Sequence, residues 1–403
     1  MRLPNPHPGR ESAEAFVSDH LGHLVCDAVA ASERFRGGQT AADSALSSFD
    51  VTGYAGRRNE VLPVGRRGAS ALSPYIRHGL LSLREVWDHV GGGPSRDVSK
   101  YRDELMWQEY SRHLYARLGR RTARGLRQEI EASREGYGWD RSMNCISFVL
   151  DELETDGWLV NQTRMWMASD WTNRNGVRWQ DGEDVFFQHL LDGSRAANRL
   201  GWQWTTGVGS SKPYGFSRWQ VNERAPELCA RCDHRSACPI EDWPDDPETV
   251  AVDVPEGLGL VGEVSPFAGP VDIEQIAAPE AVWLTAESLG AADPALLGNP
   301  DLPVVFVFDE PLLGKLCLSS KRLIFLTETL AELGVDRDLE LFLGTPPDVL
   351  GGRTVAVTHC PVPGFAKHRS VVELGELHPW PWLARPNLRS LRSFSAWRKG
   401  VRV

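Results

Sequence analysis

The sequence has no run of about 18 uninterrupted apolar residues, the length that a membrane-spanning helix needs. Its first residues, MRLPNPHPGRES, contain no apolar signal-peptide segment. Internal repeats and low-complexity tracts are absent as well. These absences argue against a membrane, repeat or secreted protein and predict a cytoplasmic location without a membrane partner.

Cysteine is scarce and unevenly spread along the chain. There are 7 cysteines, an odd number that does not suit a disulfide framework, and Cys229, Cys232 and Cys238 lie close together. Such crowding is typical of a metal site in a reducing compartment. Three unrelated reduced cysteines are the alternative.

Basic residues are fewer than acidic ones, and the formal net charge is -10. The chain as a whole is therefore not expected to bind polyanions non-specifically. A local basic stretch of seven arginines lies between Arg102 and Arg127. It can serve as a phosphate-binding face or as a solvated helical face, and charge alone favours the second interpretation.

Hydrophobic patterning divides the 403 residues into two parts. Apolar residues recur every three or four positions from 11 to about 200, which predicts helices. Short apolar runs after residue 280 alternate with a helical segment, which predicts parallel strands with a crossover helix. We therefore expect an all-helical domain over 1–240, a Pro- and Gly-rich linker over 241–279, and a smaller Rossmann-like α/β domain with a parallel sheet over 280–403.

Three motifs follow one another in the helical part. Residues 54–79 contain a tyrosine and a Ser-Ala-Leu-Ser-Pro-Tyr turn, and residues 103–114 read DELMWQEYSRHL. Residues 181–209 contain an Asp-Gly, an Asn six residues after that Asp, and a Gly-Trp-Gln-Trp. In this order and spacing the motifs resemble the FAD-binding domain of the photolyase and cryptochrome family. Without that order, the 15 tryptophans would indicate only an aromatic core.

The resemblance implies two groups of FAD-binding residues. The phosphate and ribose group is Tyr54, Ser70, Leu72 and Ser73. The flavin-ring group is Asn161, Arg164, Asp192 and Asn198, with Arg164 paired to Asp192 and Asn198 facing the flavin N5. The chemistry agrees, because a pyrophosphate binds hydroxyls and backbone N–H groups, and two serines precede an expected helix.

Three further positions at the expected cofactor site depart from the family's pattern. Gln108 stands where an Arg is usual, Ser194 replaces a second acid, and Tyr101 stands where Trp is common. The contacts made at these positions are expected to differ from those of the family.

The resemblance also implies a substrate pocket and an electron path. Lesion binding is expected from Glu104, Trp107, Met165 and Trp204, and the methionine favours cyclobutane pyrimidine dimers over (6-4) products. Trp202 corresponds to the flavin-proximal tryptophan of the electron path and Trp179 to the next. The distal member stays open among Trp139, Trp158 and Trp166.

The cysteine cluster gains a fourth member by the same resemblance. Cys145 occupies the place where iron-sulfur members of the family carry a remote ligand, so Cys145, Cys229, Cys232 and Cys238 would hold a [4Fe-4S] cluster. Zinc bound by the same four cysteines, or with His234 among the ligands, is the alternative.

Residues 281–345 and the ending NLRSLRSFSAWRKG resemble the family's antenna domain, which usually comes first in the chain. The resemblance thus implies a circularly permuted domain order, with an unrelated α/β domain as the alternative. The antenna chromophore is unknown, and we expect a monomer that acts on UV-damaged DNA. The implied function is light-dependent repair by electron transfer from reduced FAD. The alternatives are a cryptochrome-like photoreceptor and a degenerate flavin protein.

Overall fold

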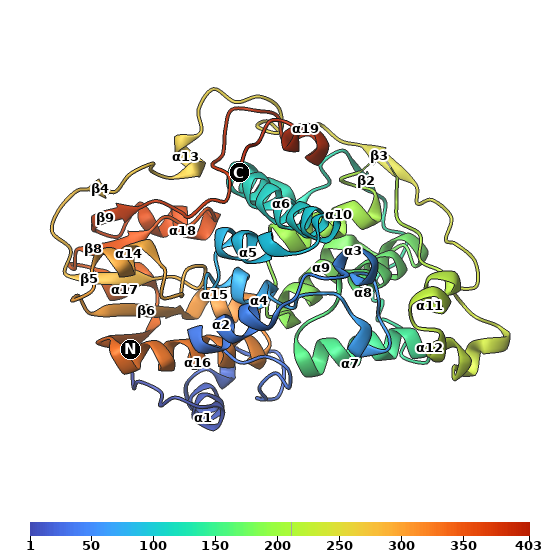
Figure 1. Cartoon of the computed structure of the whole chain (residues 1–403), viewed down its shortest axis with the longest axis horizontal. Helices are drawn as coiled ribbons and strands as arrows, with labels where there is room; N and C mark the ends of the chain where they lie inside the picture. The colour runs from blue at the N-terminus through green and yellow to red at the C-terminus, as the bar shows by residue number, and fades with distance from the viewer. Residues whose placement is uncertain (211) are drawn as a thin grey trace.

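Seven strands form one sheet, which helices cover on both faces (Figure 1). The computed structural model describes residues 1–210 and 212–403. In spatial order the strands are β1 (Arg2–Leu3), β7 (Leu339–Gly344), β6 (Val304–Asp309), β5 (Ala281–Leu284), β8 (Val355–Thr358), β9 (Leu374–His378) and β4 (Glu274–Gln275). The strand β6 reads VVFVFD and is buried along nearly its whole length, as expected for a central strand between two helical layers.

The sheet is mixed, whereas the sequence predicted a parallel sheet. The five inner strands run parallel, with Val304 of β6 opposite Val282 of β5 and Leu339 of β7. The two edge strands, β1 and β4, run antiparallel to their neighbours. Each edge strand is two residues long, too short to leave an alternating pattern in the sequence.

Two helical layers enclose this sheet. The helices around it are α1 (Arg10–His20), α14 (Pro294–Gly298), α15 (Glu310–Leu316), α16 (Ser320–Asp336), α17 (Pro346–Leu350) and α18 (Pro363–Arg369). The short helix α13 (Ser265–Ala268) instead contacts α6 (Ser95–Leu118). Phe16 of α1 contacts Phe308 on one face of the sheet, with ring centroids 6.2 Å apart. Trp283 stacks on Phe365 of α18 at 5.8 Å on the other face. The sheet thus separates two apolar cores.

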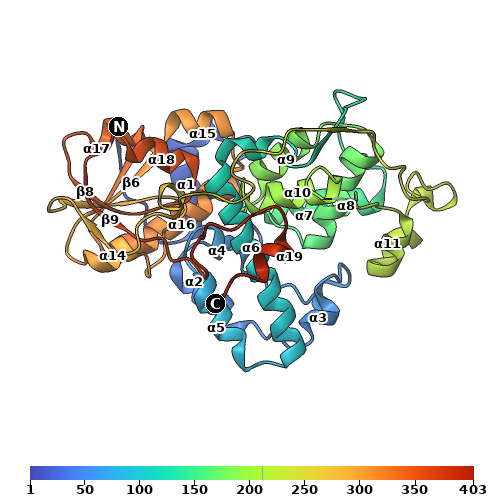
Figure 2. The same cartoon turned by 90° about the horizontal axis from the view of Figure 1, so that it is seen from above.

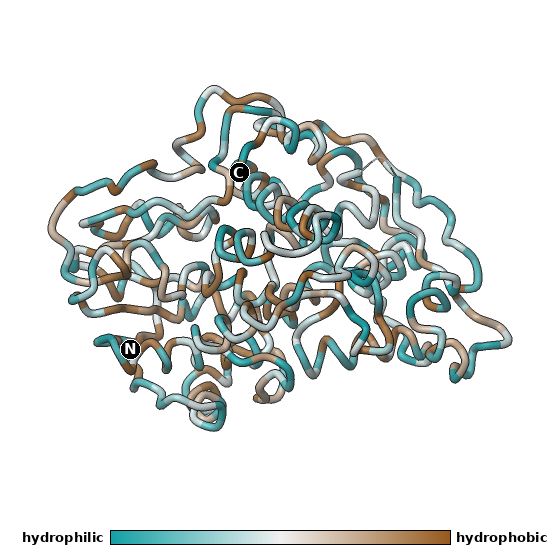
Figure 3. The backbone as a smooth tube through the Cα atoms, viewed as in Figure 1, coloured by the Kyte–Doolittle hydropathy of each residue, from teal (hydrophilic) through white to brown (hydrophobic). Residues whose placement is uncertain are grey.

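A separate helical unit lies beside the sheet (Figure 1). Its helices are α2 (Gln39–Ser48), α3 (Tyr54–Arg57), α4 (Ser73–Arg77), α5 (Leu83–His89), α6 (Ser95–Leu118), α7 (Asn144–Asp156), α8 (Asn161–Ala168), α9 (Trp179–His189), α10 (Ala197–Thr206), α11 (Arg218–Arg224), α12 (Pro226–Ala230) and α19 (Phe394–Arg398). A π-helical turn, η5 (Ser169–Arg174), continues α8, and a short strand pair joins β2 (Gln128–Ile130) to β3 (Thr249–Ala251). Hydrophobic residues lie along the central strands, and the outer connection also carries several of them, among them the exposed Leu260, Val271 and Ile276 (Figure 3).

Each end of the chain packs in the other unit from the one that the sequence predicted for it. Residues 1–31 belong with residues 268–382 in the α/β unit, because β1 joins the sheet and α1 packs on α16. Residues 383–403 instead join the core of residues 35–258, which we call the helical unit. Figure 2 shows α19 lying against α6. Hydrophobic periodicity predicts whether a segment is a helix or a strand. It does not predict which of the two cores a segment at the chain end will join, because that depends on tertiary packing.

The longest helix, α6, carries the contacts that hold the C-terminal segment. Tyr110 donates its hydroxyl hydrogen to the Leu391 carbonyl at 2.5 Å, and Trp397 donates to His113 at 3.2 Å. Glu109, fully buried, accepts from the Ala384 backbone N–H at 2.8 Å. None of the described helices is both long and apolar enough to cross a membrane.

The Glu109→Gln variant is expected to change the pH dependence of stability. Burial raises the pKa of Glu109 to about 7, above an ordinary value of 4.5. The folded state therefore binds the proton more tightly than the unfolded state. As the pH rises from 4.5 to 7, the free energy of unfolding of the natural protein falls. Gln does not ionise, so the variant does not lose this stability. Its free energy of unfolding should rise by about 3 kcal/mol relative to that of the natural protein as the pH increases through this range. Denaturant melts at pH 5 and pH 8 measure this, and parallel pH curves would contradict it.

Candidate functional site

The residues expected to bind the FAD phosphates lie together at the start of α3, α4 and the first half of α6. The Tyr101 hydroxyl donates to Ser70 Oγ at 3.0 Å. The ring of Tyr54 stands edge-on to that of Tyr101, with centroids 4.8 Å apart. Burial raises the pKa of Tyr101 to about 12, so its hydroxyl keeps its proton near neutral pH. The three hydroxyl-bearing side chains can act as hydrogen-bond donors.

The turn that leads into α4 has an unusual backbone. Ala71 has a φ of 56°, a left-handed conformation that costs a residue with a Cβ about 1 to 2 kcal/mol. Ser73 Oγ accepts a hydrogen bond from Trp158 Nε1 at 2.9 Å. Leu72 is fully buried, so at this position the side chain packs and only the backbone can face a ligand.

The residues expected around the flavin ring include a buried ion pair. Arg164 of α8 donates through Nη2 to both oxygens of Asp192, at 2.8 and 3.1 Å. Its Nε donates to the Leu159 carbonyl at 3.0 Å, which fixes the plane of the guanidinium. The side chain of Asp192 is 6% exposed and that of Arg164 is 20% exposed. The pair expected from the sequence is present, and its role at a flavin stays a prediction.

Two residues at the end of α4 connect this ion pair to the residues that are expected to bind the FAD phosphates. Arg77 Nε donates to the Gly193 carbonyl at 2.9 Å, next to Asp192. His78 Nε2 lies 3.1 Å from the Leu191 carbonyl on the other side. Burial lowers the pKa of His78, so this imidazole is neutral. The segment 70–78 and the loop 191–193 are therefore held together.

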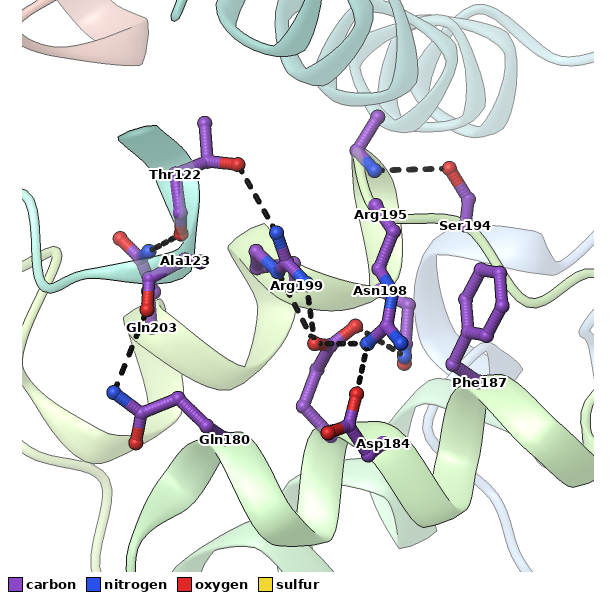
Figure 4. A network of polar contacts seen from close by, with 12 residues as sticks. Thr122, Ala123, Gln180, Asp184, Phe187, Ser194, Arg195, Asn198, Arg199 and Gln203 are labelled. Carbon is purple, nitrogen blue, oxygen red and sulfur yellow. Dashed lines mark hydrogen bonds and ion pairs between the residues drawn. The ribbon is translucent and has the colours of Figure 1, made fainter. Parts of the chain in front are cut away.

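Asn198 belongs to a network that sequence reasoning missed (Figure 4). Its side-chain N–H lies 3.4 Å from Oε1 of Glu183, which is 1% exposed. The other carboxylate oxygen of Glu183 accepts from Arg195 at 2.5 Å and from Arg199 at 3.0 Å. The sequence signal was an acid four residues after Trp179, with arginines one helix further along. Glu183 positions Asn198, and Asn198 is the residue expected at the flavin N5.

The remaining cofactor positions differ in exposure. Gln108 is half-buried on α6, and Asn161 is exposed at the first residue of α8. Ser194 Oγ accepts from the Ala196 backbone N–H at 3.0 Å and so shapes the turn before α10. The acid expected at that position in the family is replaced here by a residue with a local structural contact.

The four lesion-binding residues fall into two groups. On α6, Glu104 pairs with Lys100 at 2.9 Å, and Trp107 stacks on Phe394 with centroids 3.8 Å apart and an interplanar angle of 13°. On the neighbouring helices, Met165 is half-buried and Trp204 is 44% exposed. Among the described residues no ring contact joins Trp107 to Trp204. The stacked phenylalanine was not expected from the sequence.

The two tryptophans of the expected electron path are buried and differ in their partners. Trp202 is 2% exposed, and its Nε1 has no hydrogen-bond partner among the described residues. Trp179 is 1% exposed and donates from Nε1 to Glu129 at 3.2 Å. Whether electrons pass through them stays a prediction.

The four expected metal-binding cysteines line one pocket between α7, α12 and the loop that follows. These residues are Cys145, Cys229, Cys232 and Cys238. Burial and the neighbouring thiols raise the pKa of Cys145. Among the described residues, no three of these sulfur atoms lie within 4.8 Å of one another. The cysteines converge on one place, but more loosely than ligands of a single small ion.

A different trio, Cys26, Asp27 and His189, has ligand atoms within 4.8 Å of one another. The Asp27 carboxylate already accepts from the Ser319 hydroxyl at 2.6 Å and from the Ser320 backbone N–H at 2.7 Å. It therefore accepts from the first backbone N–H of α16, whose N-cap residue is Ser319.

The arginine stretch of α6 divides into buried and exposed members. Arg117 donates to the carbonyls of Asn387 and Arg389, both at 2.7 Å, and Arg112 donates to the Ile76 carbonyl at 3.2 Å. These two residues anchor the fold and are not available to phosphates. The exposed members are Arg120, Arg121, Arg124 and Arg127.

Known proteins resemble the helical part of the chain. The family model described as the FAD binding domain of DNA photolyase matches residues 101–225. A deoxyribodipyrimidine photo-lyase of Thermus thermophilus is 33% identical over 44% of this chain and 44% of its own length. The enzyme of the same name from Synechococcus sp. is 29% identical over 43% of this chain and 39% of its own.

A solved bacterial class III photolyase from Agrobacterium tumefaciens has a TM-score of 0.40 and 23% identity, over 55% of this chain and 46% of that one. The chain spans about two fifths of the length of these two curated relatives. The matched residues 101–225 hold Arg164, Asp192 and Asn198. Over residues 101–225 the chain is therefore similar to the FAD-binding domain of the photolyase and cryptochrome family.

Proposed function

We propose that the chain binds FAD in the helical unit and uses light to repair cyclobutane pyrimidine dimers in DNA. The observation that carries the proposal is the buried Arg164–Asp192 ion pair, beside a loop tied to the hydroxyl-rich segment 70–78. A dinucleotide needs both features, fixed charge near its ring and donors near its phosphates.

The residues present fit FAD by their donor chemistry. Ser70, Ser73 and Tyr101 offer hydroxyls, and the left-handed Ala71 turns the backbone between the two serines. Arg164 and Asp192 would lie beside the ring, with Asn198 held by Glu183. When bound, FAD supplies the absorption of light and the transfer of electrons.

The chain's own residues would bind and orient the damaged bases. A pyrimidine pair must leave the duplex at a cost of a few kcal/mol, and flat side chains repay that cost by stacking. Trp204 is exposed enough to stack, and Met165 lies on the adjoining helix α8. Glu104 would hydrogen-bond the bases, and its carboxylate now lies 2.9 Å from Lys100 Nζ and 3.7 Å from Arg58 Nε.

A photoreceptor without repair activity is the second candidate function. The specific observation in its favour is Phe394, which covers one face of the Trp107 ring. A lesion base could stack only on the opposite face of that indole. Gln108, in place of the usual Arg, is a second departure on the same helix.

The Glu104→Gln variant is expected to lose at least about 100-fold in repair rate, because hydrogen bonds to developing charge are worth about 3 kcal/mol in an excluded site. The assay incubates dimer-containing oligonucleotide with full-length protein in blue light and in darkness, and counts restored pyrimidines. Asp103→Asn is the matched control, since Asp103 neighbours Glu104 and pairs loosely with Arg398 at 3.7 Å. Flavin-loaded protein that restores no dimers would leave the photoreceptor as the function.

We further propose that the four cysteines hold a [4Fe-4S] cluster. In a tetrahedral zinc site with Zn–S bonds of about 2.3 Å, the sulfur atoms stand about 3.8 Å apart. Among the described residues no three of the four sulfur atoms come within 4.8 Å of one another, and four thiolates around one pocket are also the ligand set of a [4Fe-4S] cluster. His234, the other zinc ligand considered, contacts Ser142 Oγ at 2.8 Å.

Anaerobically purified protein should contain about four iron atoms per chain and show a broad visible absorption beneath the flavin bands. The Cys145→Ser variant should lose most of this iron. The control Cys360→Ser should keep it, because Cys360 contacts Thr285 in the α/β unit. Iron-free protein with bound zinc would instead support the zinc alternative.

The order of the two units supports a permuted family member. The helical unit takes most of its residues from the first two thirds of the chain, and the sheet with parallel inner strands follows. We propose that the α/β unit, which is built from residues 1–31 and 268–382, corresponds to the family's antenna domain, with damaged DNA as the partner of a monomer.

A further inference from the structure

Trp202 has an aromatic neighbour that the family comparison did not suggest. A side-chain carbon at Gly182 of α9 would lie 2.3 Å from Trp202 Cη2 and 3.1 Å from Trp171 Cδ1. Both indole rings therefore crowd the same point, and the absence of a side chain at Gly182 lets them approach each other. Trp171 is 6% exposed and lies in the π-helical turn η5.

Two partly exposed rings lie on the outer side of Trp171. The Trp139 ring centroid is 4.4 Å from that of Trp171, and the Tyr137 ring is 5.3 Å away in an edge-on arrangement. Both residues come from the irregular segment before α7 and are half-buried. The path from Trp202 through Trp171 thus reaches the protein surface within one further ring.

Hydrogen bonding distinguishes these two outer rings. Trp139 donates from Nε1 to the Met167 backbone carbonyl at 3.1 Å, and an amide oxygen is too weak a base to take a proton. Tyr137 donates its hydroxyl to Asp170 Oδ2 at 2.9 Å, and Asn175 donates to the same phenol oxygen at 3.0 Å. Asp170 Oδ1 has no hydrogen-bond partner among the described residues.

Asp170 is a carboxylate near neutral pH. Burial raises its pKa to about 6, against the opposing effects of the Tyr137 hydrogen bond and Arg174. At pH 7.5 the group is ionised and can accept a proton. Among the described residues, the hydrogen-bond partner of Trp139 Nε1 is the Met167 carbonyl and not a carboxylate.

On the basis of the proposed function, we infer that Trp171 and Tyr137 form the outer part of the electron path from Trp202, with Asp170 as the proton acceptor. Once Trp202 has given one electron to the light-excited oxidised flavin, Trp171 reduces Trp202 and Tyr137 reduces Trp171. The phenol O–H bond breaks as the electron leaves, and the proton passes to the Asp170 carboxylate. Tyr137 is left as a neutral radical. A small thiol in solution reduces it by one electron, and Asp170 returns the proton.

The inference differs from the family route, which leads from Trp202 to Trp179. Trp179 donates from Nε1 to Glu129, whereas Trp171 and Trp202 both lie against Gly182 of α9. The two routes predict opposite effects of two substitutions, Trp171→Phe and Trp179→Phe, both at buried positions.

The test is time-resolved absorption and electron paramagnetic resonance of the full chain after a blue flash. The natural protein should form a neutral tyrosyl radical, more slowly in D2O. Trp171→Phe should reduce the yield of long-lived radical at least tenfold. Trp179→Phe and the control Trp283→Phe, whose ring stacks on Phe365 at 5.8 Å in the α/β unit, should not. Loss of signal in Trp179→Phe with full signal in Trp171→Phe would overturn the inference.

Two milder variants keep the test independent of folding defects. Tyr137→Phe and Asp170→Asn leave both tryptophans in place, and each should abolish the tyrosyl signal while a tryptophan radical still forms. An unchanged tyrosyl signal in either variant contradicts the assignment.

Flavin content, measured first, separates failure of the proposed function from failure of this path. Protein that takes up no flavin contradicts the proposed function. The path is then tested in flavin-free protein by pulse radiolysis with azide radicals. Oxidised tryptophan should pass its hole to tyrosine, and Tyr137→Phe should reduce that transfer. No difference from the natural protein would overturn the inference.

Discussion

The Arg164→Ala variant is expected to lose bound FAD and about 3 kcal/mol of its free energy of unfolding. The substitution leaves the Asp192 carboxylate, 6% exposed, without the guanidinium that now donates to both of its oxygens. An uncompensated buried charge is costly, and the charge pattern beside the expected flavin ring disappears with it. Thermal unfolding with and without added FAD measures both effects.

Arg164→Lys and Arg141→Ala are informative companions of that variant. Lysine keeps the charge but not the planar guanidinium that is also fixed by Leu159, so flavin binding should recover only in part. Arg141 pairs with Asp151 at 2.8 Å on the surface, and its loss should change stability by less than about 1 kcal/mol. Equal effects of Arg164→Ala and Arg141→Ala would contradict the importance of the buried pair.

The Glu183→Ala variant is expected to cost about 4 kcal/mol, the largest effect on stability of any single change considered. The carboxylate is 1% exposed and accepts from both Arg195 and Arg199. Its removal leaves Arg199 without its anion and leaves Arg195 with only the exposed Asp184. Asn198 loses its partner at the same time, so FAD affinity should fall as well. Denaturant unfolding and a flavin titration measure the two losses.

Asp184→Ala is the matched control for Glu183. Asp184 is the next residue, pairs with the same Arg195 at 2.6 Å, and is 54% exposed. Solvent replaces a surface partner at little cost, so this variant should lose less than about 1 kcal/mol. If the two variants unfold alike, burial of Glu183 is not what holds the network together.

The sequence motifs predicted the pairing of Arg164 with Asp192, because both residues belong to motifs whose order and spacing resemble a known flavin domain. Local pattern also predicted the buried strand β6, since a continuous apolar run between turn residues suits a covered strand. These features depend on residues that are near in sequence or on a family's motif pattern. Both kinds of signal can be recognised in a single sequence.

Other features depend on packing between distant segments and could not be predicted. Phe394 meets Trp107 only because the last residues of the chain return to α6. Arg117 belongs to a basic stretch in the sequence, yet it bonds to four backbone carbonyls in the interior. Whether an arginine contacts a phosphate or anchors the fold depends on its tertiary contacts. The residues next to it in the sequence do not reveal those contacts.

The most direct test of the account is the flavin content of the full-length protein after reconstitution. Protein freed of bound cofactor, incubated with FAD and passed through a desalting column, should retain about one FAD per chain, identified by release and chromatography. Arg164→Ala should retain much less, and Arg141→Ala the same amount as the natural protein. A folded natural protein that retains no FAD, or retains it equally when Arg164 is removed, would contradict the proposal that this helical unit is a flavin site.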